Sequence, residues 1–255
     1  MTLKEKIKNK QKTVGMHINL NDVATARIAA LAGFDFVWID LEHSNLSLEH
    51  LLGHILALQA TGTAAIVRVP VNDLTYVKKV LEMGADGIIF PMIRSAEQAK
   101  TLLEATLYPP HGTRGFGPLN ATAYGFADTD SYIKNTRDNL CRFIQIEHID
   151  AVNALNEIVQ NPYIDGYIFG ANDLSGSLGR LGDVFGNETT AAIQKSMDIL
   201  RANEKYIGIS TGDTSEKVLS YWHNMGLDMI SAGADFDFLR EGAKQTRAVL
   251  RNIHK

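Results

Sequence analysis

The feature that most constrains the fold of this chain is a regular alternation of short apolar runs with longer amphipathic stretches along the whole sequence. The short runs are rich in Ile, Val and Phe, as expected of strands that are buried on both faces. In the longer stretches apolar residues recur every three or four positions, which indicates helices that pack on a sheet. Strands and helices that alternate in this way favour an α/β fold built around a parallel sheet.

Eight strand–helix units are expected, and eight such units close a (β/α)8 TIM barrel. The predicted strands cover residues 14–19, 36–41, 64–69, 87–91, 142–147, 166–169, 206–210 and 228–231. The predicted helices cover residues 23–32, 48–60, 74–83, 96–107, 151–159, 189–203, 216–225 and 236–253. With 255 residues the chain has the usual length of such a barrel, so we expect residues 1–255 to form a single domain.

Several predicted helices end in a similar short phrase just before the next strand. In three of these phrases Gly33, Gly84 and Gly226 stand where glycine can end a helix in the left-handed conformation. The region 108–124 is different, because it shows no clear periodicity. A loop of this length in a compact domain is usually functional, but this one would have to fold back over a mouth of the barrel to act on a substrate.

The composition argues against several classes of function. The formal net charge is −4, from 29 acidic and 25 basic residues, and neither sign forms a long run that would follow a nucleic acid or an anionic membrane. The single cysteine, Cys141, excludes an intrachain disulfide and a thiolate cluster, so any metal needs oxygen or imidazole ligands. No stretch approaches the roughly 20 apolar residues of a membrane span, and we expect a cytoplasmic protein that acts on a small molecule.

Polar residues gather where the predicted strands end, which is where TIM barrels build their active sites. They are Asp40, Glu42 and His43 at the second strand, Arg68 at the third, Gln145 and Glu147 at the fifth, and Asn172 and Asp173 after the sixth. Residues that are distant in the sequence should therefore meet on one face of the barrel.

Glu147 and Asp173 form the strongest pair in this set. Two carboxylates at neighbouring strand ends repel each other unless a cation lies between them, and oxygen ligands suit Mg²⁺ or Mn²⁺. The alternative is structural: Asp173 would cap a helix that begins near Leu174, and Glu147 would pair with an arginine. We expect the metal site.

Arg68 and His43 are the other candidates. An arginine that points into the barrel mouth needs an anionic partner, either a 2-oxo acid or a carboxylate of the barrel itself. His43 follows the second strand beside two carboxylates, and the ordinary imidazole pKa of about 6.5 suits proton transfer at neutral pH. A purely structural histidine is the alternative. His17, at the end of the first strand, is interpreted as a bystander.

Six stretches, read in order, resemble one known family. They are Asp40-Leu41-Glu42-His43, Val67-Arg68-Val69-Pro70, Met83-Gly84-Ala85-Asp86, Tyr108-Pro109-Pro110-His111, Gln145-Ile146-Glu147 and Gly170-Ala171-Asn172-Asp173. The chain is similar here to the HpcH/HpaI-type class II pyruvate-dependent aldolases. This family includes 4-hydroxy-2-oxoheptanedioate aldolase, 2-dehydro-3-deoxyglucarate aldolase and citrate lyase β-like relatives.

The resemblance implies a divalent cation, Mg²⁺ or Mn²⁺ with Co²⁺ as a further option, held by Glu147 and Asp173. Pyruvate would be bound by the metal, Arg68, Gln145 and the backbone at Asn172 and Asp173. His43 would be the base, assisted by an acidic residue that matches Glu82, where the family more often has Asp. The family also has Pro-Ala before the metal aspartate, where this chain has Ala171-Asn172. The implied reaction cleaves a 4-hydroxy-2-oxo acid to pyruvate and an aldehyde through a metal-stabilised enolate.

Two other functions stay open at this point. One is citrate-lyase-like cleavage of an acyl-CoA thioester, which needs a basic groove for the nucleotide. The other is a barrel that binds an oxo acid without turnover. No predicted strand ends in lysine, which argues against a Schiff-base aldolase. The resemblance further implies a homo-oligomer, a hexamer, in which the C-terminal helix at about residues 235–254 is exchanged between subunits.

Overall fold

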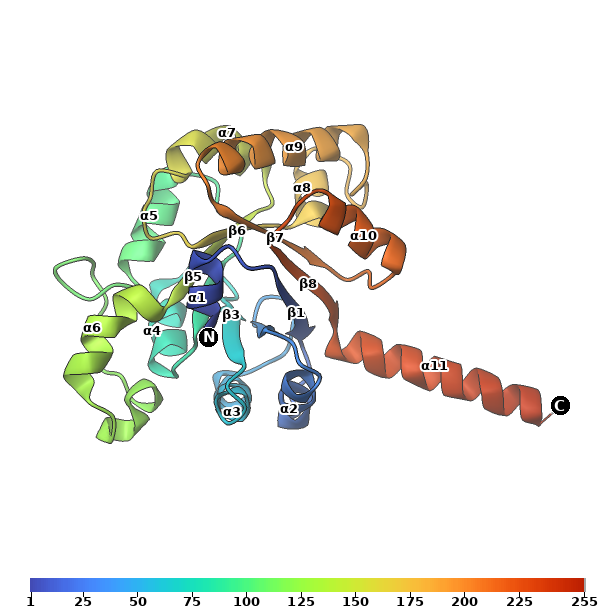
Figure 1. The fold of residues 1–255 in the computed structure, drawn as a ribbon, viewed down its shortest axis with the longest axis horizontal. Helices are drawn as coiled ribbons and strands as arrows, with labels where there is room; N and C mark the ends of the chain where they lie inside the picture. Colours follow the sequence, from blue (N-terminus) through green and yellow to red (C-terminus); the bar gives the residue numbers. More distant parts are fainter. Residues whose placement is uncertain (255) are drawn as a thin grey trace.

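The computed structural model describes residues 1–254 and confirms the closed (β/α)8 barrel (Figure 1). All neighbouring strands are parallel, each strand pairs with the next along the chain, and β8 pairs with β1. The strands are β1 (Thr13–Ile18), β2 (Phe36–Asp40), β3 (Ala64–Arg68), β4 (Gly87–Phe90), β5 (Cys141–Ile146), β6 (Gly166–Phe169), β7 (Tyr206–Thr211) and β8 (Met229–Ala234). Each predicted strand overlaps one of these.

The eight predicted helices are also present. They are α2 (Val23–Leu31), α3 (Leu48–Gln59), α4 (Leu74–Glu82), α5 (Ala96–Glu104), α7 (Ile149–Ile158), α9 (Asn187–Ala202), α10 (Glu216–Asn224) and α11 (Asp235–Ile253). Gly33, Gly84 and Gly226 have φ angles of 90°, 87° and 80°, so each follows its helix in the left-handed conformation as expected. None of the helices in residues 1–254 is long and apolar enough to cross a membrane.

Four further elements were not predicted from the periodicity. They are α1 (Leu3–Lys8), the 3₁₀ segment η1 (Asn120–Gly125), α6 (Thr129–Asn139) and α8 (Ala171–Ser177). Only Thr136 of α6 is buried, so this helix has no apolar stripe by which it could be recognised. Its amino end is stabilised instead by the Asp128 side chain, which accepts the N–H of Ser131.

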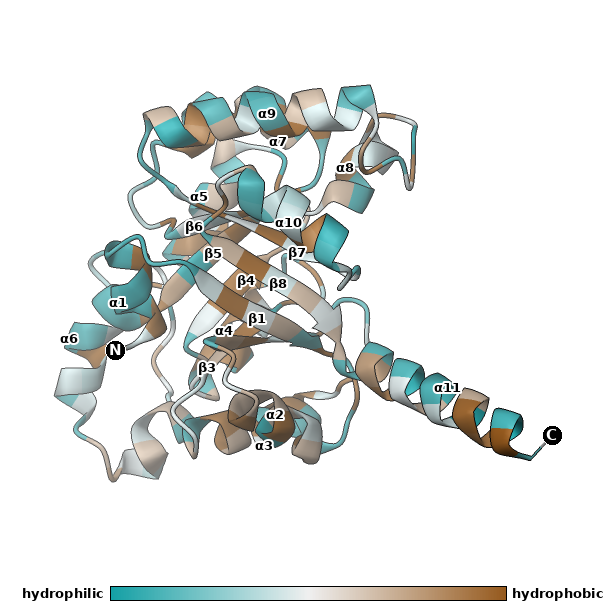
Figure 2. Ribbon diagram, turned by 45° about the vertical axis from the view of Figure 1, so that its right-hand side comes forward, coloured by the Kyte–Doolittle hydropathy of each residue, from teal (hydrophilic) through white to brown (hydrophobic). Residues whose placement is uncertain are grey.

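Alternating strand residues divide the core into two layers. Inward side chains, including Phe36, Trp38, Ile66, Phe143 and Ile168, fill the barrel, and outward side chains pack under the helices. Figure 2 shows the mainly apolar strands at the centre, surrounded by helices that carry both polar and apolar residues. This is the arrangement that makes strands of a parallel barrel almost continuously apolar.

Four aspartates fasten the amino-terminal end of the barrel at regular intervals. Each stands immediately before an even-numbered strand and accepts a backbone N–H from the odd-numbered strand that precedes it. The four bonds run from Val14 to Asp35 at 2.8 Å, Ala65 to Asp86 at 2.9 Å, Arg142 to Asp165 at 2.8 Å and Ile207 to Asp228 at 3.0 Å. The similar phrases before these strands therefore reflect one contact made four times.

Helix α1 closes the same end of the barrel. Leu3 and Ile7 join the inner core, and Lys4 Nζ donates to Asp165 Oδ1 at 2.5 Å and to the Leu140 carbonyl at 2.7 Å. A second ion pair joins Lys6 to Asp35 at 2.5 Å. Because this end is plugged, a substrate must enter at the carboxyl ends of the strands.

The long loop after α5 lies at the plugged end and not over the mouth. Asn120 Nδ2 donates to the Met83 carbonyl at 2.8 Å, just past the end of α4, and a Cβ placed on Gly117 would lie 3.2 Å from the Glu82 carboxylate. Helices run opposite to the strands of the barrel, so the end of α4 is at the amino-terminal end of β4. Within one chain the loop therefore cannot reach a substrate in the mouth.

Helix α11 projects away from the barrel (Figures 1 and 2). Almost the whole helix is exposed, and its apolar residues Leu239, Val249 and Ile253 are 67%, 57% and 72% exposed. Near its origin, Val14 on the outer face of β1 and Ile28 on α2 are 51% and 66% exposed. The flank of the barrel between α2 and α10 thus lacks the helix that usually covers β8 and β1.

Candidate active site

The centre of the mouth is an arginine held by two carboxylates. Asp40 and Arg68 are register partners at the ends of β2 and β3, two residues beyond the inward-facing Trp38 and Ile66, so both point into the barrel. Arg68 Nε donates to Asp40 Oδ1 at 2.9 Å and Nη2 donates to Oδ2 at 2.6 Å. The guanidinium lies 5.3 Å from the centre of the Trp38 ring. A planar, two-point contact of this kind fixes the orientation of the arginine.

The same guanidinium connects this pair to the rest of the mouth. Nη1 lies 3.0 Å from Glu42 Oε2 and donates to Gln145 Oε1 at 3.4 Å. Burial by itself raises the pKa of Asp40, but its bonds to Arg68 outweigh burial, and the pKa lies below the ordinary value. The barrel itself therefore supplies the anionic partner of Arg68. Within residues 1–254 the second Nη2 hydrogen of Arg68 has no acceptor, and it can be donated to a substrate.

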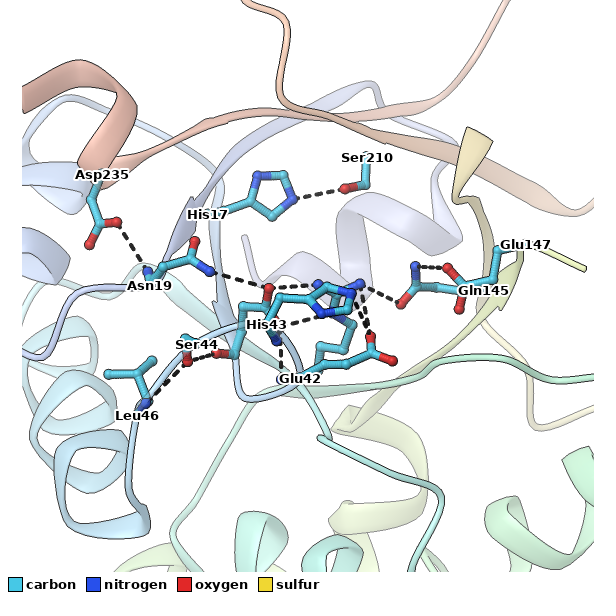
Figure 3. Close-up of polar contacts among 12 residues, drawn as sticks. His17, Asn19, Glu42, His43, Ser44, Leu46, Gln145, Glu147, Ser210 and Asp235 are labelled. Atoms are coloured by element: carbon cyan, nitrogen blue, oxygen red, sulfur yellow. Dashed lines mark hydrogen bonds and ion pairs between the residues drawn. The ribbon is translucent and has the colours of Figure 1, made fainter. Parts of the chain in front are cut away.

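His43 stands at the rim beside this cluster (Figure 3). Its side chain is 63% exposed, and Nε2 lies 3.8 Å from Glu42 Oε2. The Asp40 carboxylate accepts the backbone N–H groups of Glu42 and His43, at 2.9 and 3.3 Å, which fixes the turn that carries both residues. Burial raises the pKa of Glu42, and the nearby charges of Arg68 and His43 oppose that rise.

Glu147 lies just past β5 and is 2% exposed. Its Oε2 accepts from Gln145 Nε2 at 2.8 Å, and its Oε1 accepts the backbone N–H of Met92 at 2.5 Å. Burial raises the pKa of Glu147 to about 7, the Met92 hydrogen bond opposes this, and the like charges of Glu42 and Asp173 raise it further. The charge of Arg68 opposes the rise, but within residues 1–254 no lysine or arginine forms an ion pair with Glu147.

The backbone at Gly170 makes room for this carboxylate. A Cβ at this position would lie 2.4 Å from Glu147 Oε2, so only glycine lets the acid occupy the space above β6. Helix α8 follows directly and carries Asn172 and Asp173, both exposed, in its first turn. Gly170 is the N-cap of α8 and no side chain caps it, so Asp173 is not a capping residue. Nor does Glu147 pair with an arginine within residues 1–254.

The donor set fits a divalent cation. The charges of Asp40, Glu42 and Glu147 act on the Arg68 guanidinium, and the charge of Asp173 acts on Glu42 and Glu147. If all four carboxylates are ionised, they and the one guanidinium carry a net charge of −3. In the part of the chain that the structure describes, no cluster of three or more His, Cys, Asp or Glu side chains could hold a metal by itself. A cation bound between Glu147 and Asp173 would take water or substrate oxygens as its other ligands.

Glu82 is not brought to this site within one chain. It is the last residue of α4 and lies beside the loop at Gly117, at the plugged end of the barrel. His43 is at the opposite end. Any assistance from Glu82 to a histidine of the mouth would have to come from a second copy of the chain.

Several contributors to the site were missed or undervalued from the sequence. The sequence marks Asp40 only as a strand-end residue, although it is the main partner of Arg68 in the structure. The equal lengths of the two predicted strands are the signal that could have placed these residues side by side. The Met92 N–H, in a residue with a φ of 51°, gave no signal. The sequence also gave no signal for the hydrogen bond that Asn19 Nδ2 donates to Asp40 Oδ2 at 3.3 Å.

Comparison with known proteins identifies the family of this chain. The family model described as HpcH/HpaI aldolase/citrate lyase matches residues 13–236. The chain is 30% identical over 250 residues to the hydroxypyruvate/pyruvate aldolase of Roseovarius nubinhibens, covering 98% of this chain and 96% of the relative. It is also 30% identical to the 4-hydroxy-2-oxo-heptane-1,7-dioate aldolase of Salmonella dublin, covering 96% and 92%. The crystal structure of an HpcH/HpaI aldolase/citrate lyase family protein from Burkholderia cenocepacia superposes with a TM-score of 0.92 at 26% identity, over 98% of both chains.

Proposed function

This chain belongs to the HpcH/HpaI aldolase/citrate lyase family and is an aldolase, a carbon–carbon lyase, and we propose that it cleaves 4-hydroxy-2-oxo acids. The products are pyruvate, or hydroxypyruvate, and an aldehyde. The names of the relatives support this choice of three-carbon product. The observation that carries the proposal is the uncompensated negative charge around Glu147, next to an arginine with one donor still free.

We assign the cation site to Glu147 and Asp173 and the cation to Mg²⁺ or Mn²⁺, with Co²⁺ as a further option. When bound there, a divalent cation supplies polarisation of the 2-oxo group and balances the charge that develops on its oxygen. Gly170 and the Met92 N–H support the assignment, because they hold the Glu147 carboxylate in one orientation.

The remaining roles follow from position. The free Nη2 hydrogen of Arg68 donates to the substrate, Gln145 holds Arg68 and Glu147 in a fixed relation, and the N–H groups at Asn172 and Asp173 receive the carboxylate. His43 removes the proton of the 4-hydroxyl as the C3–C4 bond breaks. The electron pair of that bond stays on C3 as the enolate of pyruvate, which is then protonated, and the aldehyde leaves.

We also propose that the chain forms a homo-oligomer, a hexamer by family resemblance, in which α11 of one copy covers the exposed flank of another. The apolar residues on α11 and on the flank at Val14 and Ile28 support this, since they are exposed in the part of the chain that the structure describes. In such an assembly a neighbouring copy could also bring Glu82 to the mouth. The glutamate would then assist His43 as the resemblance implies.

The test is exchange of the pyruvate methyl protons in D₂O, followed by proton NMR with Mg²⁺ and with a chelator. Exchange reports formation of the enolate without an aldehyde. We expect Mg²⁺-dependent exchange in the wild type, its loss in Glu147→Gln, and wild-type rates in Glu157→Gln, a matched change at an exposed position of α7. Undiminished exchange in Glu147→Gln, or exchange that the chelator leaves unaffected, contradicts the proposal.

A further inference from the structure

One polar pair in the mouth has no part in the mechanism described above. His17 on β1 is 9% exposed and uses both ring nitrogens: Nδ1 lies 2.9 Å from the Gly233 carbonyl oxygen and Nε2 lies 2.9 Å from Ser210 Oγ on β7. Figure 3 shows this pair apart from the Glu42, His43 and Gln145 group. Its ring packs on Trp38, with ring centres 5.0 Å apart. The contact thus joins three strands on the inner face of the barrel.

The backbone is shaped for this contact. The pairing of β1 with β8 shifts by one residue between Gly15 and His17, so His17 lies opposite Ala234 and not Gly233. Gly233 has a φ of 71°, and a Cβ there would lie 2.7 Å from Phe238 and Thr214 side-chain atoms. The irregularity turns the Gly233 carbonyl toward the imidazole, as bulges next to active sites commonly do.

These contacts determine where the hydrogens are. A carbonyl oxygen only accepts, so His17 Nδ1 carries a hydrogen and donates it to Gly233. Burial lowers the pKa of His17, more than the Gly233 bond raises it, and the ring is neutral. Nε2 is then an acceptor, and Ser210 must donate its only hydroxyl hydrogen to it. What Ser210 offers to the mouth is an oxygen with free lone pairs.

Ser210 stands level with the metal-site carboxylate. Ile146, Phe169 and Ile209 share one register row of β5, β6 and β7, so the next residues, Glu147, Gly170 and Ser210, follow in a row at the strand ends. Gly170 has no side chain to separate the other two. Backbones two strands apart in a sheet are roughly 10 Å apart, which leaves space for a small molecule between the side chains.

We propose that Ser210, oriented by His17, accepts a hydrogen bond from a hydroxyl group of the substrate and makes the site selective for hydroxylated substrates. This proposal rests on the aldolase function proposed above, and it identifies a residue that determines substrate specificity. The hydroxyl can belong to the oxo acid, as in hydroxypyruvate, or to the aldehyde, as in glycolaldehyde. When a substrate without a hydroxyl is bound, the Ser210 oxygen is partly shielded from water and has no hydrogen-bond donor. Leaving this acceptor unpaired makes binding of such a substrate less favourable.

The experiment compares aldol synthesis from four pairs of substrates with Mg²⁺ present. Pyruvate and hydroxypyruvate are each combined with acetaldehyde and with glycolaldehyde, so the two sources of the hydroxyl are separated. In Ser210→Ala we expect kcat/KM for the recognised hydroxylated partner to fall by about threefold to tenfold, the usual effect of one neutral hydrogen bond, with the pair that lacks hydroxyls unchanged.

Two variants serve as controls. Ser210→Thr keeps the hydroxyl and should keep the preference. Ser231 lies opposite Ser210 on β8, and its buried hydroxyl has no hydrogen-bond partner within residues 1–254. Ser231→Ala removes this hydroxyl and should change nothing. Nitrogen-15 NMR of the histidine rings should show His17 with its hydrogen on Nδ1 in the wild type. The opposite tautomer contradicts the proposal.

The results separate this inference from the proposed function. Equal losses for all four pairs in Ser210→Ala, or a wild type without preference for a hydroxyl, overturn the role of Ser210 and leave the aldolase intact. If the wild type makes no product at all, the proposed substrates are wrong. Calorimetric binding of hydroxypyruvate with Mg²⁺, and of glycolaldehyde with Mg²⁺ and pyruvate, then still tests Ser210. If the affinities for both compounds are the same in wild type and in Ser210→Ala, the proposal is contradicted.

Discussion

Arg68 and Asp40 end neighbouring strands and meet through two parallel hydrogen bonds, of 2.9 and 2.6 Å, with both side chains more than nine-tenths buried. The pair holds the guanidinium over Trp38 and directs its one free Nη2 hydrogen into the mouth. It also holds the turn at Glu42 and His43, through the two backbone N–H groups that Asp40 accepts. One ion pair thus positions both the guanidinium that we propose binds the substrate and the histidine that we propose is the base.

Arg68→Lys should therefore be far from conservative. A lysine keeps the charge but has neither the planar fork nor the second donor, so at least one charge-assisted hydrogen bond to Asp40 or to substrate is lost. We expect kcat/KM to fall by about 10- to 100-fold, as the loss of one such bond predicts. Steady-state kinetics with thermal unfolding as a control would check this. Activity close to that of the wild type in a stable variant would show that the fork is unnecessary.

The raised pKa of Glu147 predicts an unusual dependence on pH. Its folded pKa of about 7 is above the ordinary value of 4.5, so between these values the folded, metal-free protein binds more protons than the unfolded chain. The free energy of unfolding should then fall as pH rises from 4.5 to 7, by up to about 3 kcal/mol from this group. Urea unfolding in chelator across this range would measure it.

Glu147→Gln is the control for that slope, because the amide does not titrate. In this variant the fall in stability between pH 4.5 and 7 should be much smaller. Mg²⁺ should act in the opposite sense on the wild type, since metal and proton compete for the same carboxylate, and Mg²⁺ should stabilise more as pH rises. Equal slopes in the two proteins would mean that another group is responsible.

The sequence was informative where one physical pattern repeats. Buried parallel strands need apolar residues on both faces, and these apolar runs allowed all eight strands to be predicted. Gly33, Gly84 and Gly226 marked the ends of three helices. Helix α6 was missed because its stability comes from a cap and from loop contacts and not from an apolar stripe. Boundaries were therefore less certain than the order of elements.

The places of the candidate site residues in the fold could be predicted where position along a strand alone selects them. Arg68 ends β3, the residues Glu147, Asp173 and His43 come after strands, and strand ends meet in a barrel. The role of His17 could not be read in this way, because it depends on a one-residue shift between β1 and β8 and on a carbonyl turned by Gly233. The family resemblance implies that Glu82 assists His43. The direction of α4 shows instead that, within one chain, the two residues lie at opposite ends of the barrel.

The exposed helix α11 predicts that assembly depends on its apolar residues. Val249→Glu and Ile28→Glu should each lower the molar mass measured by light scattering, since the first changes α11 and the second changes the flank it would cover. Leu181→Glu is the matched control, because Leu181 is 78% exposed and lies on neither surface. If all three variants keep the wild-type mass, α11 is not exchanged between copies.

The last prediction concerns Gly170, which should be required for the metal site although it contacts no metal. A methyl group at this position would lie 2.4 Å from Glu147 Oε2, and the carboxylate would have to rotate away from the Met92 N–H and from Gln145. Changes in the groups that orient a metal ligand typically weaken metal binding by about 10- to 100-fold, and we expect a loss of this size for Mn²⁺ in Gly170→Ala. Electron paramagnetic resonance of free Mn²⁺ measures the affinity directly.

Gly212→Ala is the control for this prediction, because a Cβ at Gly212 meets nothing within 4 Å and the Mn²⁺ affinity should not change. Tight Mn²⁺ binding in Gly170→Ala would show that Glu147 does not need its present orientation, and the cation would then have to be held by other residues.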